Sequence, residues 1–421
     1  MQSQPADPLG PDRPRFSPLR PWLVAVAAGL ALAWALGLKL PEGGGSPLRA
    51  PLVTQARQGT RPPRAPGSAP ADRSQRTPST IPARRALRSL DRRFASPDGL
   101  FYKYEGGGIY AGAWAAAQAL EGAVALSKLP GRTVGKGRIL ALFERLHPYW
   151  DGASRTPGYD KSARPPYGTG GYKFYDDNAL IGLALIRAYG STRDPAMLRR
   201  AAQLFAFETS GWDSSRADPH PGGVFWSQSP IARARNTVST AGAAQLGLRL
   251  YLLSGRRRYL AWATRMYDWV NRNLKAPDGL YWDRVGPRGT ISRTTWSYNQ
   301  GLMLGAAQLL YRATGRRAYL HRARAIAHAA LVLFRGAVLD RQRPIINAIF
   351  VRNLLALGRI SPRSAPRYLH AAERYARYLR RRVDPRTGVL RVTDRPELLD
   401  QAALLQVDAY IALARRKIPI G

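Results

Sequence analysis

After Ile81, apolar residues recur at spacings of three and four positions, which is the period of amphipathic helices. Gly or Pro closes each stretch, and almost no segment shows the alternating pattern of a strand. The pattern predicts helices over 83–94, 111–127, 138–146, 176–189, 196–208, 236–253, 259–274, 296–313, 319–334, 345–357, 365–381 and 398–414. This number of helices suits six helical hairpins.

Three segments share a pattern of helix, Gly turn and helix; they begin at Ala184, Ala243 and Ala306. A tyrosine recurs at matching points, about 60 residues apart, at positions 189, 251 and 311. This spacing exceeds the roughly 34 residues of a two-helix solenoid repeat and fits hairpins joined by long loops. We therefore expect an all-α fold, an (α/α)6 barrel whose inner helices line a central cleft and whose loops form the rim. An open helical solenoid is the alternative.

An uncharged apolar run covers residues 21–38 and follows three arginines. Its length lies at the border between the core of a signal peptide and a membrane-spanning helix. Positive charge ahead of a first apolar segment favours a cytoplasmic N-terminus. The sequence therefore predicts a basic cytoplasmic N-terminus at 1–20 and a transmembrane or signal-anchor segment at 21–40. Cleavage after Ala35, which would release a secreted form, is the alternative.

Residues 41–82 are rich in Pro, Gly, Ser, Thr and Arg and have no hydrophobic periodicity. Such a segment cannot bury enough apolar surface to fold, which predicts a disordered linker. The folded domain is then expected at 83–421. With 45% hydrophobic residues in a chain of 421, a substantial core is within reach.

The chain carries 65 Lys and Arg against 27 Asp and Glu, a formal net charge of +38. A surface of this kind attracts nucleic acid, anionic lipid or an acidic wall polymer through the same long-range field. Because the arginines are spread along the chain rather than gathered on one helix, we expect no nucleic-acid partner. The chain contains no cysteine, which excludes disulfides, thiolate metal sites and cysteine nucleophiles.

Two adjacent aspartates, Asp176 and Asp177, open an apolar helix directly after a glycine-rich loop. One acid is enough to cap a helix start, so the second needs another explanation. Two carboxylates held close push one pKa up, which supplies the protonated acid and the ionised carboxylate that glycoside cleavage uses. Adjacent residues place these groups about 5 to 6 Å apart, nearer the gap of retaining than of inverting glycosidases. Asp176 and Asp177 are therefore the candidate catalytic residues.

An ordered set of motifs extends over about 300 residues: YDDNAL at Tyr175, GGVFW at Gly222, RNTVSTAGAAQLGLRLY at Arg235, DGLYWD at Asp278, TWSYNQGLMLGAAQLLY at Thr295 and AIFVRNLLAL at Ala348. In this order they resemble glycoside hydrolase family 76, the endo-α-1,6-mannanases and their fungal cell-wall relatives, from about residue 101 to 411. The resemblance implies a six-hairpin helical barrel, with Asp176 as nucleophile and Asp177 as general acid/base.

Two positions depart from the family pattern. Leu180 stands where the family often has Trp, and Asn347 and Ala348 replace a common Lys-Gly pair before the IFVRNL stretch. Both departures leave the acids in place, so they bear on sugar subsites rather than on the chemistry.

Aromatic residues and amides near the expected rim are candidates for substrate binding. Sugar rings stack on Trp and Tyr while their hydroxyls bond to amides and acids. The candidates are Tyr175, Asn178, Gly223, Trp226, Asn236, Trp282, Trp296, Tyr298, Asn299 and Gln300. Trp226, which follows a Gly-Gly turn, is the preferred subsite residue. For each aromatic residue the alternative is packing between helices.

Other chemistries fail on spacing. The five histidines include no H-E-x-x-H motif, and GRTVGKG at Gly131 has one residue too few between its glycines for a phosphate loop. No third acid follows Asp176 and Asp177, unlike the magnesium-binding motif of a prenyl-diphosphate cyclase. We therefore expect no metal and no cofactor.

The acid pair and the resemblance together predict a retaining endo-α-1,6-mannanase that hydrolyses α-mannan or a mannose-bearing envelope glycan. A mannan transglycosylase would share the covalent intermediate and differ only in the acceptor. A non-catalytic module that binds wall glycan is the alternative from another class. We expect a monomer in the cell membrane, with one spanning segment and an extracellular catalytic domain, or else a secreted protein.

Overall fold

The computed structural model describes residues 80–131, 133–215 and 218–421. The predictions for the basic N-terminus, the membrane segment and nearly all of the linker fall within 1–79, outside the described residues. Within the described ranges, no helix combines the length and the apolar character needed to cross a bilayer.

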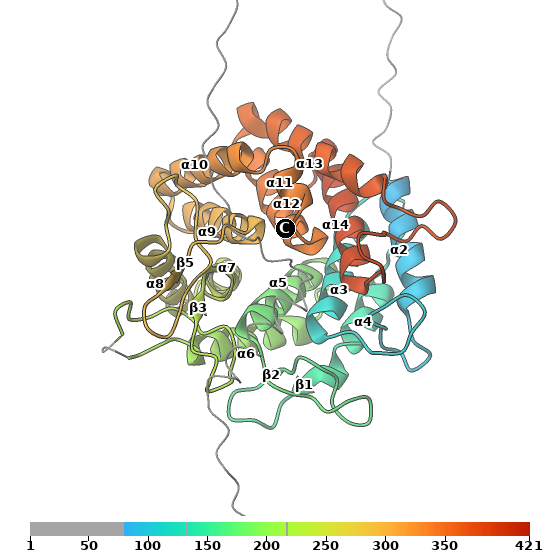
Figure 1. Cartoon of the computed structure of the whole chain (residues 1–421), viewed down its shortest axis with the longest axis horizontal. Helices are drawn as coiled ribbons and strands as arrows, with labels where there is room; N and C mark the ends of the chain where they lie inside the picture. The colour runs from blue at the N-terminus through green and yellow to red at the C-terminus, as the bar shows by residue number, and fades with distance from the viewer. Residues whose placement is uncertain (1–79, 132, 216–217) are drawn as a thin grey trace, which may run out of the picture. The chain divides into compact units, whose positions relative to one another are not determined.

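In the described part of the chain, long helices alternate between an outer and an inner position (Figure 1). The outer helices are α2 (Ile81–Phe94), α4 (Lys136–Glu144), α6 (Pro195–Ser210), α8 (Arg257–Asn273), α10 (Arg317–Leu333) and α13 (Ala365–Arg380). The inner helices are α3 (Ala113–Ser127), α5 (Tyr175–Thr192), α7 (Thr237–Ser254), α9 (Ser297–Thr314), α12 (Pro344–Ile360) and α14 (Leu398–Arg415). Every helix predicted from the periodicity is confirmed, and bounds differ by three residues or fewer.

The inner helices form a closed ring, because each packs against the next and α14 returns to α3. Each outer helix lies against inner helices; α6, for example, contacts α5 and α7. An open solenoid would leave α14 and α3 apart, so that alternative is wrong. The prediction of an all-helical barrel is confirmed.

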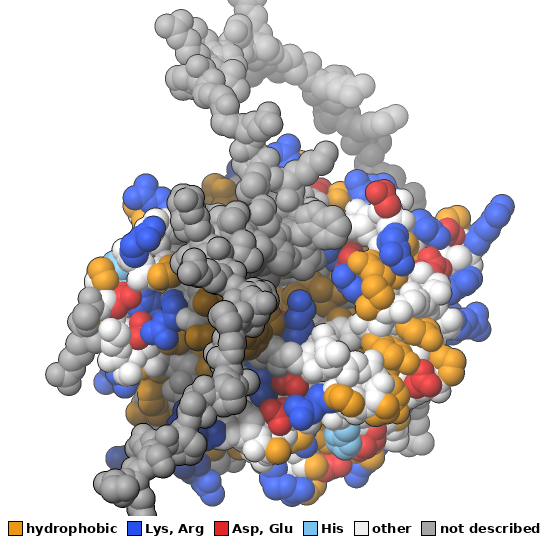
Figure 2. Space-filling model, turned by 60° about the horizontal axis from the view of Figure 1, so that its bottom comes forward, with side chains coloured by type: hydrophobic (Ala, Val, Ile, Leu, Met, Phe, Trp, Pro, Cys, Tyr) orange, Lys and Arg blue, Asp and Glu red, His pale blue; other side chains and the backbone are white. Residues whose placement is uncertain are grey.

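Burial explains why the two rings have different sequences. Inner helices are enclosed on almost every side, and in α7 every residue from Thr237 to Leu248 is buried. Outer helices bury one stripe and carry arginine elsewhere, as in α8, where Arg257 and Arg258 are exposed and Trp269 is fully buried. On the face shown in Figure 2, Lys and Arg side chains are scattered among acidic and apolar ones.

Glycines in the inner helices set how closely the helices approach. A Cβ atom added at Gly301 of α9 would lie 2.7 Å from the Cα of Phe350 in α12. A Cβ atom at Gly182 of α5 would lie 2.8 Å from the Leu246 side chain of α7. Because real Cβ contacts are longer than this, a larger residue would push the ring apart.

All inner helices run in the same direction, since an outer helix returns the chain between each two. Their N-terminal ends therefore share one end of the barrel, together with the long loops that precede them. These loops contain short strands that the sequence did not predict: β1 (Trp150–Asp151) pairs with β2 (Gly158–Tyr159), and β4 (Arg284–Val285) lies between β3 (Arg235–Asn236) and β5 (Ile291–Ser292), all antiparallel. Short helical turns complete the connections: η1 (His147–Tyr149), α11 (Ala337–Asp340) and η2 (Pro362–Ser364).

A polar side chain at the fourth position of five inner helices holds the preceding loop. These residues are Asn178, Thr240, Gln300, Asn347 and Gln401. The amide of Asn178 accepts from the backbone N–H of Tyr159 at 2.8 Å and donates to its carbonyl at 3.0 Å. Gln300 makes the same two bonds with Tyr281, at 2.8 and 2.9 Å. Each helix start is thereby fixed to the loop that forms the rim.

Candidate active site

Asp176 and Asp177 are the second and third residues of α5, in the first turn of an inner helix at the loop end of the barrel. Both side chains are partly buried, and Asp176 Oδ1 accepts a hydrogen bond from the backbone N–H of Asp177 at 3.0 Å. The helix dipole favours negative charge at this end. The local fold therefore presents two carboxyl groups side by side at the mouth of the ring.

Both acids have raised pKa values. Burial raises the pKa of Asp176 to about 7, against two backbone N–H groups that favour its ionised form, and the charge of Asp283 adds to the rise. Burial and then the charge of Asp176 raise the pKa of Asp177 well above its ordinary value, with Lys161 opposing. Each carboxyl group therefore takes up a proton more readily than an ordinary aspartate.

A third carboxyl group, Asp283, lies in the same electrostatic neighbourhood. It is 5% exposed, immediately precedes β4, and accepts a 2.7 Å bond from Arg284 Nη1. Burial followed by the charges of Asp283 and Asp176 raises the pKa of Tyr298, the second residue of α9. Tyr298 and Asp283 therefore share the site with the acid pair.

Glu208, near the end of α6, is a further acid close to the pair. It is fully buried, and neither carboxyl oxygen has a hydrogen-bond partner within the part of the chain that the structure describes. Burial, and then the charge of Asp176, raise its pKa well above the ordinary value. This environment disfavours the ionised form of Glu208.

Neither Asp283 nor Glu208 was predicted from the sequence as a site residue. Asp283 ends the DGLYWD motif, so an acid directly after two aromatic residues was an available signal. Glu208 lies on an outer helix, where an isolated acid is usually solvated, and only the tertiary contact with α5 reveals it.

A network of ion pairs shapes the loop that leads into α5. Lys173 Nζ lies 2.7 Å from Asp151 and 3.3 Å from Asp160, and Arg164 bridges the same two acids at 3.3 and 2.9 Å. Lys173 and Asp160 are nearly inaccessible to solvent, so the pairs are only weakly screened. The loop therefore holds the start of α5 in a defined position.

Several predicted aromatic residues lie partly exposed near the acids. The backbone carbonyl of Trp226 accepts a hydrogen bond from the N–H of Tyr175 at 3.0 Å. The centroid of the Trp226 ring lies 5.4 Å from that of the Phe174 ring. Trp282 and Trp296 are also partly exposed, beside Asp283 and at the start of α9. These rings stay available for sugar stacking.

Other predicted substrate residues have structural roles. All amide N–H groups of Asn178 and Gln300 donate to backbone carbonyls, so these side chains hold loops and do not reach a ligand. Tyr175 is 5% exposed and stacks on Phe207 with ring centroids 4.4 Å apart. Gly223 has φ +83°, and a Cβ atom there would lie 2.6 Å from the Trp269 ring.

The two remaining predicted amides occupy intermediate positions. Asn236 caps α7 by accepting from the N–H of Ser239 at 3.4 Å and is 8% exposed. Asn299 is fully buried and lies close to the carboxyl group of Asp283, whose pKa burial raises.

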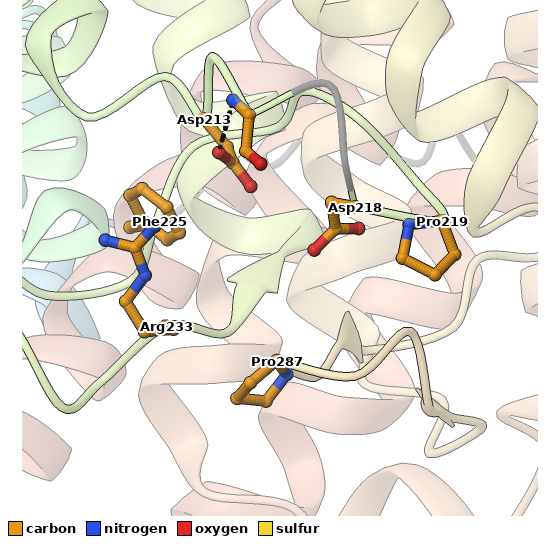
Figure 3. Close-up of a pocket in the computed structure, with 7 residues that line it drawn as sticks. Asp213, Asp218, Pro219, Phe225, Arg233 and Pro287 are labelled. Carbon is orange, nitrogen blue, oxygen red and sulfur yellow. Dashed lines mark hydrogen bonds between the residues drawn. The ribbon is translucent and has the colours of Figure 1, made fainter.

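A hollow of about 300 Å³ on the rim lies apart from the acid pair (Figure 3). Asp213 and Asp218 line it, yet both are bound by the fully buried Arg235, at 2.7 and 2.9 Å. The guanidinium of Arg233 lies 4.4 Å from the ring centroid of Phe225. Because its acids are already paired, this hollow holds the loop before α7 and does not supply catalytic groups.

A second hollow of about 300 Å³ lies beside the start of α5. It is lined by Arg155, Thr156, Tyr172, Tyr175, Ser210 and Gln228. Tyr172 is 60% exposed there, next to the loop that carries Trp226. Asp176 and Asp177 are not among the residues that line this hollow.

A pair of carboxyl groups with raised pKa values, at the mouth of a helical barrel, suits a glycoside hydrolase. Residues 101–387 match the sequence profile of glycosyl hydrolase family 76, and the chain belongs to this family. The match includes both aspartates of α5 and the loops that bear Trp226 and Asp283.

Curated relatives include two yeast proteins. The mannan endo-1,6-alpha-mannosidase DCW1 of Candida glabrata is 29% identical over 180 residues, which cover 39% of this chain and 40% of that protein. The protein of the same name from Saccharomyces cerevisiae is 28% identical over 179 residues, 39% of each chain. The matched region thus spans about two fifths of the length of these relatives.

Solved structures share the fold over most of their length. The family 76 mannosidase Bt3792 of Bacteroides thetaiotaomicron has a TM-score of 0.71 at 23% identity, covering 80% of this chain and 98% of that one. Another is an inactive variant of the α-1,6-mannanase GH76A of Salegentibacter, in which two consecutive aspartates are changed to asparagine, in complex with α-1,6-mannotriose. It has a TM-score of 0.67 at 22% identity, covering 79% of this chain and 99% of that one. At these identities the likeness concerns the fold.

Proposed function

We propose that the chain is a retaining endo-α-1,6-mannanase that hydrolyses α-mannan or a mannose-bearing envelope glycan. The observation that carries the proposal is the pair Asp176 and Asp177 in the first turn of an inner helix, both with raised pKa values. The names of the yeast relatives and the paired aspartates changed in the inactive Salegentibacter variant support it.

In the first step Asp176, ionised, attacks the anomeric carbon of the mannosyl unit. Asp177 gives its proton to the glycosidic oxygen as the carbon–oxygen bond breaks, and the leaving chain departs as an alcohol. The product is a mannosyl ester on Asp176. Asp177, now ionised, then takes a proton from water; the resulting hydroxide attacks the anomeric carbon and frees Asp176.

The neighbouring groups fit these roles. The N–H of Asp177 and the helix dipole favour the ionised form of Asp176, while burial keeps Asp177 protonated until it is needed. Asp283 and Tyr298 offer an acceptor and a donor to the hydroxyls of the sugar beside the nucleophile. Trp226, Trp282 and Trp296 are the proposed stacking platforms for neighbouring sugar rings.

The test is incubation of the full chain with linear α-1,6-mannooligosaccharides, beside other α-linked mannans and glucans, with products resolved by size. We expect internal cleavage of the α-1,6-linked chains, lost by at least a hundredfold in Asp176→Asn and Asp177→Asn. Asp394→Asn, which changes an exposed acid, is the matched control and should keep full activity.

The same products separate the alternatives. Chains longer than the starting oligosaccharide would show transfer to a sugar acceptor and would make the protein a transglycosylase. Binding without any cleavage would instead make it a glycan-binding module. Full activity in both Asp→Asn variants would refute the assignment of the acid pair.

We also propose that the protein is a monomer that is held in the cell membrane by one segment, with the catalytic domain outside the cell. The support is the uncharged apolar run at 21–38 after three arginines. Membrane fractionation of the full chain and of a variant lacking this run tests the anchor. Recovery of the full chain in the soluble fraction after export would replace the anchored form by the secreted one.

A further inference from the structure

A second cluster of charged residues lies in the C-terminal halves of the inner helices, at the end of the barrel opposite the acid pair. It comprises Glu121 of α3, Arg187 of α5, Arg249 of α7, Arg352 of α12 and Tyr410 of α14. Arg187 follows Asp176 by eleven residues on the same helix, which separates them by about 16 Å along its axis. The cluster is therefore independent of the proposed chemistry.

The single acid of this cluster is fully engaged. Glu121 Oε2 accepts from Arg187 Nε at 2.6 Å, and Oε1 accepts from the hydroxyl of Tyr410 at 2.6 Å. Arg352 Nη1 lies 3.6 Å from the same Oε1 atom. The side chains of Glu121, Arg187 and Arg352 are 2%, 3% and 4% exposed, so these charges are removed from water.

Positive charge exceeds negative charge in the cluster. Glu121 offsets one of the three guanidinium groups, which leaves two in excess. Burial, followed by repulsion from Arg187 and Arg352, lowers the pKa of Arg249. Burial, with repulsion from Arg187 and Arg249, lowers the pKa of Lys128 to about 8. An uncompensated buried charge is costly, and a bound counter-charge removes that cost.

Hydrogen-bond donors are in excess as well. Four buried nitrogen atoms have no acceptor within the described part of the chain: Arg187 Nη1, Arg249 Nε, and Nε and Nη2 of Arg352. They belong to three different inner helices. The planar forks of guanidinium groups match the oxygen atoms of an oxyanion, whereas a neutral acceptor would leave the charge excess in place.

We propose that this cluster binds one small inorganic oxyanion of the phosphate or sulfate class at the floor of the barrel. The anion enters from the end of the barrel where Arg249 and Gly421 lie close together. Arg249 is partly exposed there, and a Cβ atom added to Gly421 would lie 3.4 Å from Nη2 of Arg249. Figure 1 marks the C-terminus within the ring. By joining α5, α7 and α12, the anion stabilises the closed barrel.

The test is thermal unfolding of the full chain in increasing phosphate, at ionic strength held constant with a large organic salt. We expect Tm to rise by several degrees, in proportion to the logarithm of phosphate concentration once this exceeds Kd, and isothermal titration should saturate at one phosphate per chain. Arg249→Gln should weaken phosphate binding about tenfold or more. Arg257→Gln, an exposed arginine on α8, should leave it unchanged.

A second variant distinguishes an anion site from a purely structural cluster. Glu121→Gln removes the only negative charge and should bind phosphate about tenfold more tightly than the native chain. Phosphate dependence that is unchanged in Arg249→Gln would overturn the proposal, as would the absence of saturable binding. Equal stabilisation by chloride at matched ionic strength would overturn the oxyanion class.

Discussion

At the residue scale, two neighbouring aspartates at the start of α5 have raised pKa values. Asp176 accepts an N–H bond that favours its ionised form, yet burial raises its pKa to about 7. Burial and the charge of Asp176 raise the pKa of Asp177. These raised values have consequences for stability.

Replacing either acid by asparagine should stabilise the protein at neutral pH. Between about pH 4 and pH 7 the folded state holds a proton on Asp176 that the unfolded state has released, so the free energy of unfolding falls as pH rises. A raised pKa costs at most about 1.4 kcal/mol per unit. Asp176→Asn removes this cost, and its Tm should exceed that of the native chain by a few degrees at pH 7 to 8.

Calorimetry across about pH 3 to 8 checks this expectation. The difference in Tm should vanish at about pH 3, below the pKa of an unfolded aspartate, where both states carry the proton, and Asp394→Asn should show no such trend. A lower Tm for Asp176→Asn at pH 8 would mean that the carboxylate is stabilised by contacts and not penalised by burial.

Removal of Asp283 should shift the pH dependence of catalysis. Its charge raises the pKa of Asp176, so Asp283→Asn should move the acidic limb of the kcat/KM profile to lower pH, by up to about one unit. The measurement is initial rate against pH on a soluble α-1,6-mannooligosaccharide. An acidic limb that stays in place or moves to higher pH would show that Asp283 does not act on Asp176.

At the element scale, the helices could be predicted from the sequence because their periodicity is local, whereas the contacts of the amides could not. An amide near a helix start suits a sugar ligand and a loop anchor equally, and only the partner decides between them. For Asn178 and Gln300 the partners are the backbones of Tyr159 and Tyr281, far away in sequence. The short strands of the rim were not predicted, because a strand of two residues is too short to show an alternation of apolar and polar side chains.

Gln300→Leu should weaken both stability and substrate binding. It removes three hydrogen bonds and leaves buried backbone groups of Tyr281 unpaired, which costs about 2 to 4 kcal/mol. The freed loop carries Trp282 and Asp283, so KM should rise more than kcat falls. Urea unfolding and steady-state kinetics on the same preparation measure the two effects.

Gln308→Leu provides the matched control for this loop effect. The side chain of Gln308 lies on the same helix and donates to the carbonyl of Asn353 rather than to a rim loop. It should lower stability without altering KM. Equal KM values for both variants would show that the Gln300 contact does not position the rim.

At the scale of the whole molecule, the helices and their pairing into hairpins could be predicted from the sequence. The distance between neighbouring helices of the inner ring could not. Tyrosines repeating about 60 residues apart indicated hairpins. The ring closes where α14 contacts α3, and the buried arginines lie together at its floor. Both features depend on contacts between residues far apart in sequence, such as Glu121 and Tyr410, which are 289 residues apart. Such contacts leave no local trace beyond an unusual number of glycines in apolar helices.

The same substitution at two glycines should therefore change stability in opposite directions. In Gly301→Ala the new methyl group meets the backbone of Phe350 at 2.7 Å, which a side-chain rotation cannot relieve, so the ring must open locally at a cost of about 1 to 3 kcal/mol. Gly190, an exposed residue near the C-terminal end of α5, has no atom within 4 Å of the added Cβ, and Gly190→Ala should stabilise by about 0.5 to 1 kcal/mol through helix propensity. Urea unfolding of both variants measures the contrast. If Gly301→Ala were as stable as the native chain, the spacing of α9 and α12 would not be what sets the closure of the barrel.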